Sequence, residues 1–304
     1  MKVLVTGGAG FIGSHLVDKL INEGYKVAVI DDLSNGNLDF INKKAQFVEA
    51  DIISQNFFQV FTKLNPKIVF HLAAQSSINK SLKNPSLDIE VNLIATQKLL
   101  DLSKSTNVDK FIFASSSAVY KPADLLPLKE DAPKEPISLY GVSKLCSEYL
   151  IRNFYKLYNL PCFSLRLANV YGPRQDSGAE GGVVAIFLHN VLSEKISKIH
   201  GNGKQTRDFI YVSDVIGAFM KSLEKEVVGE FNIGTAKETS INDLIEILSR
   251  IANSKIDRAY TSLPYPEVQR SALAYDKFRQ STGWNPKVNL EEGLSITYDY
   301  FKNL

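Results

Sequence analysis

Residues 2–14 read KVLVTGGAGFIGS, an apolar run that changes at once into a glycine-rich loop. Gly7, Gly10 and Gly13 follow the spacing G-x-x-G-x-x-G, and a helical pattern begins inside the loop. Glycines at these positions let the chain turn tightly, let the backbone approach a pyrophosphate, and let the helix pack close to the strand. The helix N-terminus then points its free amide groups at the phosphates. The pattern predicts a dinucleotide-binding unit, with a plain flexible strand–helix turn as the alternative.

A second strand pattern ends in two acidic residues, Asp31 and Asp32. Asp31 lies 18 residues beyond Gly13, close to the spacing expected for a carboxylate that binds the adenosine ribose hydroxyls. An acid at this place repels a 2′-phosphate, which favours NAD over NADP. The two acids could instead cap a loop, but strand, glycines, helix and acid follow in the order of a dinucleotide site.

Short apolar runs alternate with helical patterns through the first half of the chain. Strands buried on both faces have such continuous apolar runs. Their alternation with helices predicts right-handed crossovers and a parallel sheet. The strand-like runs are residues 2–6, 26–31, 45–51, 67–73, 110–116 and 162–168, and helical spacing covers residues 11–23, 85–106 and 138–158.

After residue 168 the sequence becomes richer in glycine and polar residues. We therefore predict an α/β fold with a Rossmann-type doubly wound parallel sheet and a smaller C-terminal α/β substrate lobe. Residues 1–168 are assigned to the NAD-binding domain. Segments within about 207–235 are expected to return to its sheet, as the strands RDFIYV (207–212) and EFNIG (230–234). Residues 169–206 and 236–304 are assigned to the substrate lobe.

The overall composition excludes several classes of protein. The 304 residues carry a formal net charge of +2, so no basic surplus predicts nucleic-acid binding. No apolar run reaches the roughly 18 residues needed to span a bilayer, and no signal-peptide pattern is present. The two cysteines fit a reducing compartment, so a cytoplasmic protein is expected. The four histidines lie far apart, which argues against a metal site.

A tyrosine–lysine pair follows a strand that ends in serines. Tyr140 and Lys144 are one helical turn apart and share a helix face. The same spacing recurs at Tyr298 and Lys302, where a solvated helix is expected, so spacing alone is a weak argument. Only Tyr140 follows a strand of the predicted parallel sheet, and ligands bind at the carboxyl ends of such strands.

Taken together, these motifs resemble the extended short-chain dehydrogenase/reductase superfamily over nearly the whole chain. Within it the sequence is most similar to the UDP-sugar 4-epimerases of the UDP-glucose 4-epimerase type. The motifs that carry the resemblance are TGGAGFIGSH (6–15), HLAAQSS (71–77), SSSAVY (115–120), YGVSK (140–144), RLANVYGPRQ (166–175) and RDFIYVSD (207–214).

The resemblance implies that Ser116, Tyr140 and Lys144 are catalytic. Tyr140 would take the proton of the sugar C4 hydroxyl, NAD would take the C4 hydride, and hydride would return to the other face of the 4-keto sugar. Free tyrosine has a pKa near 10, and lowering it by about three requires roughly 4 kcal/mol. One cation about 6 Å away supplies on the order of 2.8 kcal/mol at an effective dielectric of 20. Lys144 and oxidised NAD would share this task.

The resemblance also implies which residues bind cofactor and substrate. Arg207 would hold the diphosphate as a bidentate fork, with a rim ion pair to Asp208 as the alternative. His200 would flank the uracil, or be a plain surface histidine. Asn92 would contact the nicotinamide side of the cofactor, or simply cap a helix. The residues expected to contact NAD are Gly7, Gly10, Phe11, Ile12, Gly13, Asp31, Asp32, Asn35, Asp51, Ile52, Leu72, Ala73, Ala74, Asn92, Tyr140 and Lys144. Those expected to contact the UDP-sugar are Ser116, Ser117, Tyr140, Asn169, His200, Arg207 and Ser271.

Certain positions discriminate among members of the superfamily. Ser117 and Ala118 stand where the 4,6-dehydratases carry an Asp-Glu pair, and neither can serve as the acid or base that elimination needs. Ser271 is small at the position of the pocket gatekeeper, so plain and N-acetylated hexoses are both expected to fit. Alternatives are another nucleotide-sugar oxidoreductase and a non-catalytic NAD-sensing regulator.

The sequence departs from the family pattern at Lys121, where a glycine is usual, and at Leu139, where a proline is usual. Pro264 replaces an arginine that grips the nucleotide, and Arg270 is a possible substitute nearby. These changes bear on the loop above Ser116 and on the identity of the nucleotide. The family resemblance further implies a homodimer formed through the helices of residues 85–106 and 138–158.

Overall fold

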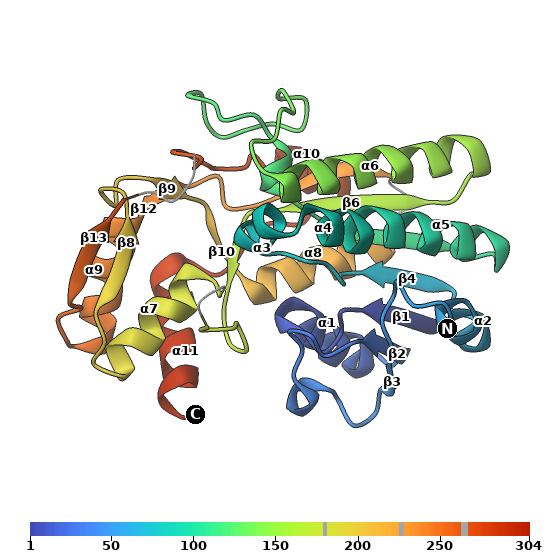
Figure 1. Cartoon of the computed structure of the whole chain (residues 1–304), viewed down its shortest axis with the longest axis horizontal. Coiled ribbons are helices and arrows are strands. Elements are labelled where there is room, and N and C mark those ends of the chain that lie inside the picture. Colours follow the sequence, from blue (N-terminus) through green and yellow to red (C-terminus); the bar gives the residue numbers. More distant parts are fainter. Residues whose placement is uncertain (179–180, 225–227, 263–266) are drawn as a thin grey trace.

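The computed structural model describes residues 1–178, 181–224, 228–262 and 267–304. A seven-stranded parallel sheet of order β11-β6-β5-β4-β1-β2-β3 forms its centre (Figure 1). This order confirms the Rossmann-type doubly wound fold that the sequence predicts. The strands are β1 (Lys2–Thr6), β2 (Lys26–Asp31), β3 (Gln46–Glu49), β4 (Ile68–His71), β5 (Lys110–Ser116), β6 (Cys162–Leu167) and β11 (Gly229–Ile233).

Helices cover both faces of this sheet. On one face α1 (Phe11–Asn22) packs against α8 (Val212–Glu224). On the other face α5 (Ala95–Ser105) packs between α2 (Phe57–Leu64) and α6 (Leu139–Tyr158). Parallel strands need such crossover helices, which leave no face of the sheet open to water.

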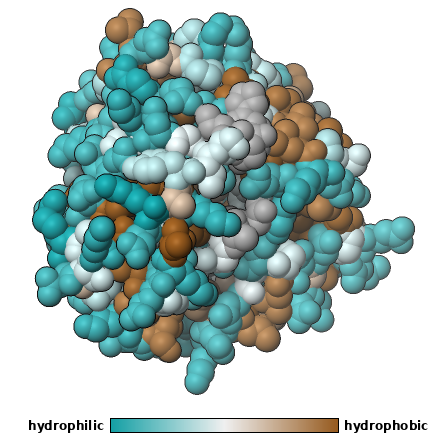
Figure 2. Space-filling view, turned by 60° about the vertical axis from the view of Figure 1, so that its left-hand side comes forward, coloured by the Kyte–Doolittle hydropathy of each residue, from teal (hydrophilic) through white to brown (hydrophobic). Residues whose placement is uncertain are grey.

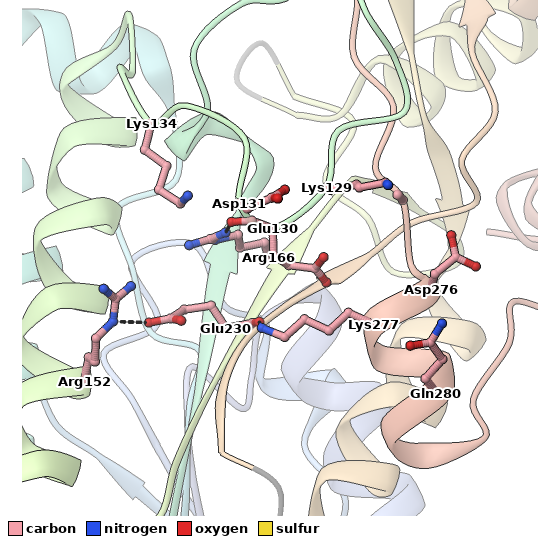
Figure 3. Close-up of a pocket in the computed structure, with 11 residues that line it drawn as sticks. Lys129, Glu130, Asp131, Lys134, Arg152, Arg166, Glu230, Asp276, Lys277 and Gln280 are labelled. Atoms are coloured by element: carbon pink, nitrogen blue, oxygen red, sulfur yellow. Dashed lines mark hydrogen bonds and ion pairs between the residues drawn. The ribbon is translucent and has the colours of Figure 1, made fainter.

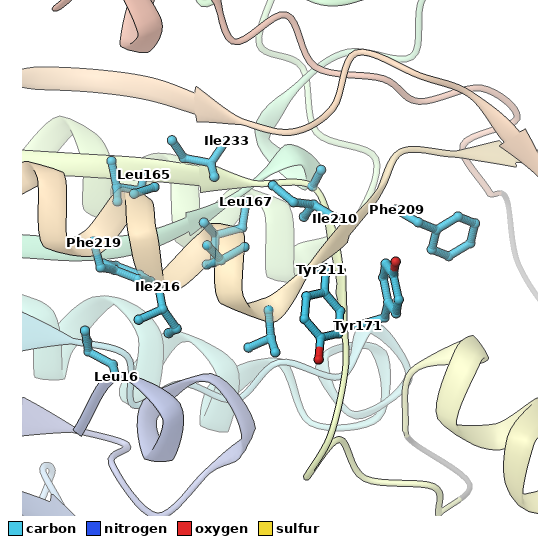
Figure 4. Close-up of a cluster of buried hydrophobic side chains, with 14 of the residues drawn as sticks. Leu16, Leu165, Leu167, Tyr171, Phe209, Ile210, Tyr211, Ile216, Phe219 and Ile233 are labelled. Carbon is cyan, nitrogen blue, oxygen red and sulfur yellow. The ribbon is translucent and has the colours of Figure 1, made fainter. Parts of the chain in front are cut away.

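Alternate side chains of each strand supply the two hydrophobic cores. Val3 and Val5 of β1 belong to the cluster that includes Leu16 of α1, part of which is drawn in Figure 4. Leu4 belongs to the opposite cluster, with Leu99 of α5. Because successive strand residues point to opposite faces, a strand covered on both sides must be apolar throughout. This is why residues 3–5 of the run KVLVT are all apolar.

Before α5 the chain forms α3 (Ile78–Lys83), α4 (Pro85–Ile89) and the π-helical turn η2 (Glu90–Ile94). The predicted helix over residues 85–106 is therefore present, with one widened turn inside it. None of the helices in the described ranges has the length and apolar character that crossing a membrane requires.

The C-terminal part adds three small strand pairs and further helices. Helices α7 (Val183–Leu192), α9 (Ile241–Ala252) and α11 (Leu290–Lys302) pack against one another, and α10 (Asp276–Thr282) contacts β11. The face turned forward in Figure 2, on the side of these elements, is mostly hydrophilic with small hydrophobic groups. The strand pairs are β7 (Asn169–Tyr171) with β10 (Phe209–Tyr211), β9 (Thr206–Arg207) with β12 (Thr239–Ser240), and β8 (Ser197–His200) with β13 (Arg258–Thr261).

The expectation that residues 207–212 return to the central sheet is wrong, whereas β11 does join it beside β6. The run is interrupted at Asp208, which has no exposed surface. Its carboxylate accepts hydrogen bonds from the backbone amides of Thr235, Ala236 and Leu273. A buried carboxylate must find such donors, and this need outweighs continuous strand pairing. The division of the chain into two domains stays a prediction.

A buried polar network joins α6 to the sheet. Arg166 of β6 forms a bidentate ion pair with Glu148 of α6, with Nε–Oε1 and Nη2–Oε2 distances of 2.9 and 2.7 Å. Ser115 of β5 donates to the same Oε1 atom at 2.6 Å. Arg166 Nη1 also donates to the Tyr120 hydroxyl, which donates to Asn232 of β11. The network therefore links three neighbouring strands and the helix above them, next to the carboxyl end of β5.

A charged pocket of about 460 Å³ borders this network (Figure 3). Arg166 forms part of its wall, and an ion pair between Arg152 and Glu230 closes one side. None of the residues predicted to bind cofactor or substrate lines it. This pocket is therefore separate from the predicted site.

Losing one partner of the buried Glu148–Arg166 ion pair should destabilise the fold more than losing both. We expect Glu148→Leu to lower the free energy of unfolding by about 3–5 kcal/mol, because Arg166 keeps a buried charge without its partner. The double variant Glu148→Leu/Arg166→Met removes both charges and should recover a large part of the loss. Urea denaturation followed by circular dichroism measures both variants. Equal losses in the single and double variants would contradict this account.

Candidate active site

The glycine loop between β1 and α1 has the close contacts that a dinucleotide cradle requires. Gly7 has a φ of +72°, and a Cβ atom there would lie 2.6 Å from the Ala73 amide nitrogen. A Cβ atom on Gly13 would lie 2.0 Å from the Gly7 carbonyl oxygen. Helix α1 starts at Phe11, after Gly10, and has no side-chain cap. The amide groups of its first turn are thus left for a ligand, which fits a pyrophosphate.

Asp31 at the end of β2 braces this loop. Its Oδ2 atom accepts a hydrogen bond from the Ala9 amide and its Oδ1 atom one from the Leu33 amide, both at 2.9 Å. Burial raises the pKa of this carboxyl group. Asp32 instead accepts from the amide and hydroxyl of Ser34, so it caps the turn, as one reading of the sequence held open.

Most of the remaining residues predicted to contact the cofactor follow the carboxyl ends of β2, β3 and β4, which lie on the two sides of β1 in the sheet. The amide of Leu72 donates to the Thr6 carbonyl oxygen at 3.1 Å, which keeps this segment beside the end of β1. Because the strands are parallel, their carboxyl ends meet at one edge of the sheet. After β2 lie Asp32 and Asn35, after β3 lie Asp51 and Ile52, and after β4 lie Leu72, Ala73 and Ala74; Ile12 is the second residue of α1.

Ser116 and Tyr140 meet at the same edge. Ser116 ends β5, and its hydroxyl accepts a hydrogen bond from the Ala118 amide at 3.1 Å. Tyr140 lies in the first turn of α6, which is capped by Ser138. Burial raises the pKa of Tyr140 to about 12, against the lowering effect of a hydrogen bond with Ser116. The protein alone thus favours the neutral phenol, and forming the phenolate requires added positive charge.

Lys144 is buried beside them, with 2% of its surface exposed. Its Nζ atom donates to the Ala114 carbonyl oxygen at 2.9 Å and lies 5.9 Å from the centre of the Tyr140 ring. Burial lowers the pKa of Lys144 to about 8, while the charges of Asp88 and Glu148 raise it. The ammonium form of Lys144 therefore still predominates at neutral pH, although it loses its proton more easily than a free lysine does.

The second tyrosine–lysine pair, Tyr298 and Lys302, shows how much of the geometry follows from the four-residue helical spacing alone. Lys302 Nζ lies 5.8 Å from the centre of the Tyr298 ring on α11, the same separation within 0.1 Å. Lys302, however, is exposed, and its helix packs in the C-terminal part. The two pairs differ in burial and in their position relative to the sheet.

Asn92 lies within the π-helical turn η2, with 1% of its surface exposed. Its side chain exchanges two hydrogen bonds of 2.9 Å with the backbone of Gln75 and donates to Ser143 Oγ at 3.2 Å. It therefore ties η2 to α6, the helix of Tyr140. The sequence predicted a cofactor-side contact or a cap for Asn92 and did not identify Asp88, although Asp88 precedes it by one helical turn.

The predicted substrate residues come from the C-terminal strand pairs and from β5. Asn169 starts β7, and Ser117 directly follows β5. His200 ends β8, is exposed, and forms a 2.9 Å hydrogen bond with Thr261. Ser271 is buried, with 9% exposed.

Arg207 already has an anionic partner. It forms an ion pair with Glu267 and donates to the carbonyl oxygens of Thr206 and Val268 at 2.8 Å each. The alternative rim ion pair with Asp208 is wrong, because that carboxylate faces backbone amides in the interior.

Arg270, expected to replace the missing arginine at Pro264, is also engaged. Its guanidinium forms a bidentate ion pair with Glu238, at 3.0 and 2.6 Å. Pro264 itself lies outside the described residues. Arg207 and Arg270 are therefore each already paired with a carboxylate.

Comparison with known proteins identifies the family. Residues 3–234 match the profile of the NAD dependent epimerase/dehydratase family. The chain belongs to this family. It is 37% identical to a UDP-glucose 4-epimerase of Mycolicibacterium smegmatis, with 100% of this chain and 99% of that protein covered. NAD is the cofactor, and the glycine loop has the shape to hold it.

Solved structures agree over the full length. The structure of UDP-glucose 4-epimerase with UDP-glucose from Thermotoga maritima superposes with a TM-score of 0.97 at 42% identity, covering 100% of this chain and 99% of that one. A UDP-N-acetylglucosamine 4-epimerase of Methanobrevibacter ruminantium, in complex with UDP-N-acetylmuramic acid, gives 0.94 at 34% identity, covering 99% and 98%.

Proposed function

We propose that this protein is an NAD-dependent isomerase that inverts C4 of a UDP-sugar, interconverting UDP-glucose and UDP-galactose and their N-acetylated counterparts. The observation that supports this most is the meeting of Ser116, Tyr140 and Lys144 at the carboxyl edge of the sheet, where the glycine loop also lies. The similarity of the chain to UDP-sugar 4-epimerases over its full length supports the same reaction.

In this mechanism Ser116 orients the sugar C4 hydroxyl and Tyr140 accepts its proton. The Lys144 ammonium stabilises the Tyr140 phenolate. When bound, NAD supplies a reversible acceptor for the hydrogen on C4. The resulting 4-keto sugar turns over in the site, and Tyr140 returns the proton to the oxygen of the inverted alcohol.

The pKa values of the protein alone set the requirement for this chemistry. Tyr140 has a pKa of about 12 and Lys144 one of about 8, so Lys144 would lose its proton first. A working base requires the reverse, a phenolate next to an ammonium. With oxidised NAD bound, its positive charge would lower the pKa of Tyr140 and so favour the phenolate that the mechanism requires.

The diphosphate of the substrate would be held by Arg207 and Asn169. Because Arg207 is paired with Glu267 in the protein alone, binding exchanges one anionic partner for another. The exchange costs little Coulomb energy for the arginine but requires Glu267 to move away from the diphosphate.

Competing functions differ in what they consume. Ser117 and Ala118 lack the acid and base for elimination, which disfavours a dehydratase. A net reductase would use NADH or NADPH in equal amounts with product, and a regulator that only senses NAD would change neither sugar nor cofactor.

The hydroxyl of Tyr140 should be required for turnover. We expect Tyr140→Phe to reduce epimerisation at least about 100-fold, because the proton acceptor is lost while the ring remains. Proton NMR of the anomeric signals during incubation with UDP-glucose measures the reaction. Tyr298→Phe is the matched control, since its ring has the same relation to a lysine, and it should stay fully active. Unchanged turnover by Tyr140→Phe contradicts the mechanism.

The sugar range should depend on Ser271. The relatives with solved structures include epimerases of plain and of N-acetylated UDP-hexoses, so family membership leaves both open. We expect Ser271→Tyr to cut turnover of UDP-N-acetylglucosamine at least about 10-fold while UDP-glucose is still converted, because the larger ring fills the space for the acetamido group. Parallel NMR assays of the two substrates give the ratio. Normal use of the N-acetylated sugar by this variant rejects the assignment.

We further propose a homodimer formed through the helices of residues 85–106 and 138–158, with α3 beside them. α3, α4 and α6 contact one another and lie together in Figure 1. Their outer surfaces carry large apolar side chains, the kind of face that a second copy of the same chain would cover. The exposed residues are Leu82, Leu87, Ile89, Ile94, Val142 and Tyr149.

A charge on this face should separate the subunits. We expect Tyr149→Glu to halve the mass measured by light scattering, because the interface would bury an unpaired carboxylate. Ile196→Glu is the control, since Ile196 is also a large exposed hydrophobic residue but lies between α7 and β8. If wild type is a monomer, or if both variants behave alike, the proposed interface is wrong.

A further inference from the structure

Asp88 on α4 is a buried carboxylate that the proposed mechanism does not use. It has no exposed surface. Its Oδ1 atom accepts hydrogen bonds from Gln75 Nε2 at 2.8 Å and Asn92 Nδ2 at 3.1 Å. Its Oδ2 atom is buried and has no hydrogen-bond donor in the described part of the chain. A charge in this position is costly unless an opposite charge compensates it.

Lys144 on the neighbouring α6 is that opposite charge. Two carboxylates favour its charged form, Asp88 from α4 and Glu148 from its own helix. Glu148 is already neutralised by its bidentate pair with Arg166. Asp88 has no ion-pair partner within contact distance among the described residues, so its charge remains to act on Lys144.

The other groups that face Lys144 cannot take this role. His71 of β4 is buried between Thr6 and Thr96, and burial, together with the charge of Lys144, lowers its pKa to about 3, so it is neutral. Tyr140 is a neutral phenol in the protein alone. Among the described residues, Asp88 is therefore the carboxylate without an ion-pair partner whose charge favours the ammonium form of Lys144.

Asp88 is also connected to the catalytic helix through hydrogen bonds. Asn92, which donates to Asp88, donates as well to Ser143 of α6. Ser143 Oγ in turn donates to the Tyr140 carbonyl oxygen at 3.0 Å, and Ser147 Oγ donates to the Asn92 carbonyl oxygen at 2.9 Å. The carboxylate thus holds the amide that fixes the first two turns of α6.

We propose that Asp88 is a positioning residue of the active site, which orients Asn92 and Gln75 against α6 and supplies the negative charge opposite the Lys144 ammonium. The kinetic test of this inference rests on the proposed epimerase function, whereas the NMR titration of Lys144 does not. Asp88 raises the pKa of Lys144 and also that of Tyr140. Asp88 therefore raises the pKa of the first proton that the Tyr140–Lys144 pair loses, whichever of the two residues loses it.

The substitution Asp88→Asn removes the charge and keeps an oxygen that can accept from Gln75 and Asn92. In samples with 13C-labelled lysine, we expect the NMR titration of Lys144 to move to lower pH by about one unit relative to wild type. The signal is assigned by its absence in Lys144→Met. Asp101→Asn on α5, an exposed aspartate, is the control and should leave the titration in place. An unmoved Lys144 titration in Asp88→Asn overturns the proposal.

The pH dependence of turnover provides the second measurement. The active form of the pair has lost one proton, so removing Asp88 should shift the acid limb of the kcat profile to lower pH by about one unit. A merely structural role would lower activity or thermal stability without moving this limb. If Asp88→Asn does not fold, the smaller uncharged variant Asp88→Ser takes its place with the same expectations. If wild type interconverts no UDP-sugar, the proposed function fails while the lysine titration still decides the role of Asp88.

Discussion

The hydrogen bond from Lys144 Nζ to the Ala114 carbonyl oxygen is the contact on which the rest of the site depends. Ala114 lies in β5 two residues before Ser116, so the bond fixes α6 to the end of the strand that carries the proposed catalytic serine. It uses one of the three protons of the ammonium and leaves two for other acceptors. The burial that permits this bond also destabilises the charged form of Lys144. The carboxylates of Asp88 and Glu148 oppose this effect by favouring the ammonium.

Much of the sheet could be predicted because its strands are buried on both faces. Six of its seven strands were recognised from continuous apolar runs, and the seventh, β11, was recognised from EFNIG (230–234). The prediction was wrong for residues 207–212, where the apolar pattern looks like a single strand. There the run is interrupted at Asp208, whose carboxylate accepts hydrogen bonds from backbone amides about 27 and 65 residues further along the chain. A local sequence pattern does not predict hydrogen-bond partners so far apart in the sequence. The ion pair between Arg207 and Glu267 could not be predicted for the same reason.

For the candidate site, the sequence predicts residue types and order, whereas their electrostatics appear only in the folded chain. The two tyrosine–lysine pairs have nearly the same geometry, so the helical spacing fixes the distance in both. What separates them is the environment of the lysine, which at Lys144 includes a carboxylate from another helix. Asp88 lies in a stretch, NPSLDIEVN (84–92), that looks like an ordinary amphipathic helix. Only the packing of α4 against α6 brings its charge to the reacting pair.

The order of strands in the sheet has a consequence for how the chain folds during synthesis. β6 ends at Leu167, but its outer neighbour β11 begins at Gly229, so about sixty residues are made in between. Until β11 has left the ribosome, the backbone of β6 presents an open edge, with Phe163 and Leu165 beside it. Open apolar edges attract strands of other nascent chains. The first 168 residues should therefore be a poor autonomous fragment, prone to aggregate, even though they contain the whole glycine loop and the three side chains proposed to be catalytic.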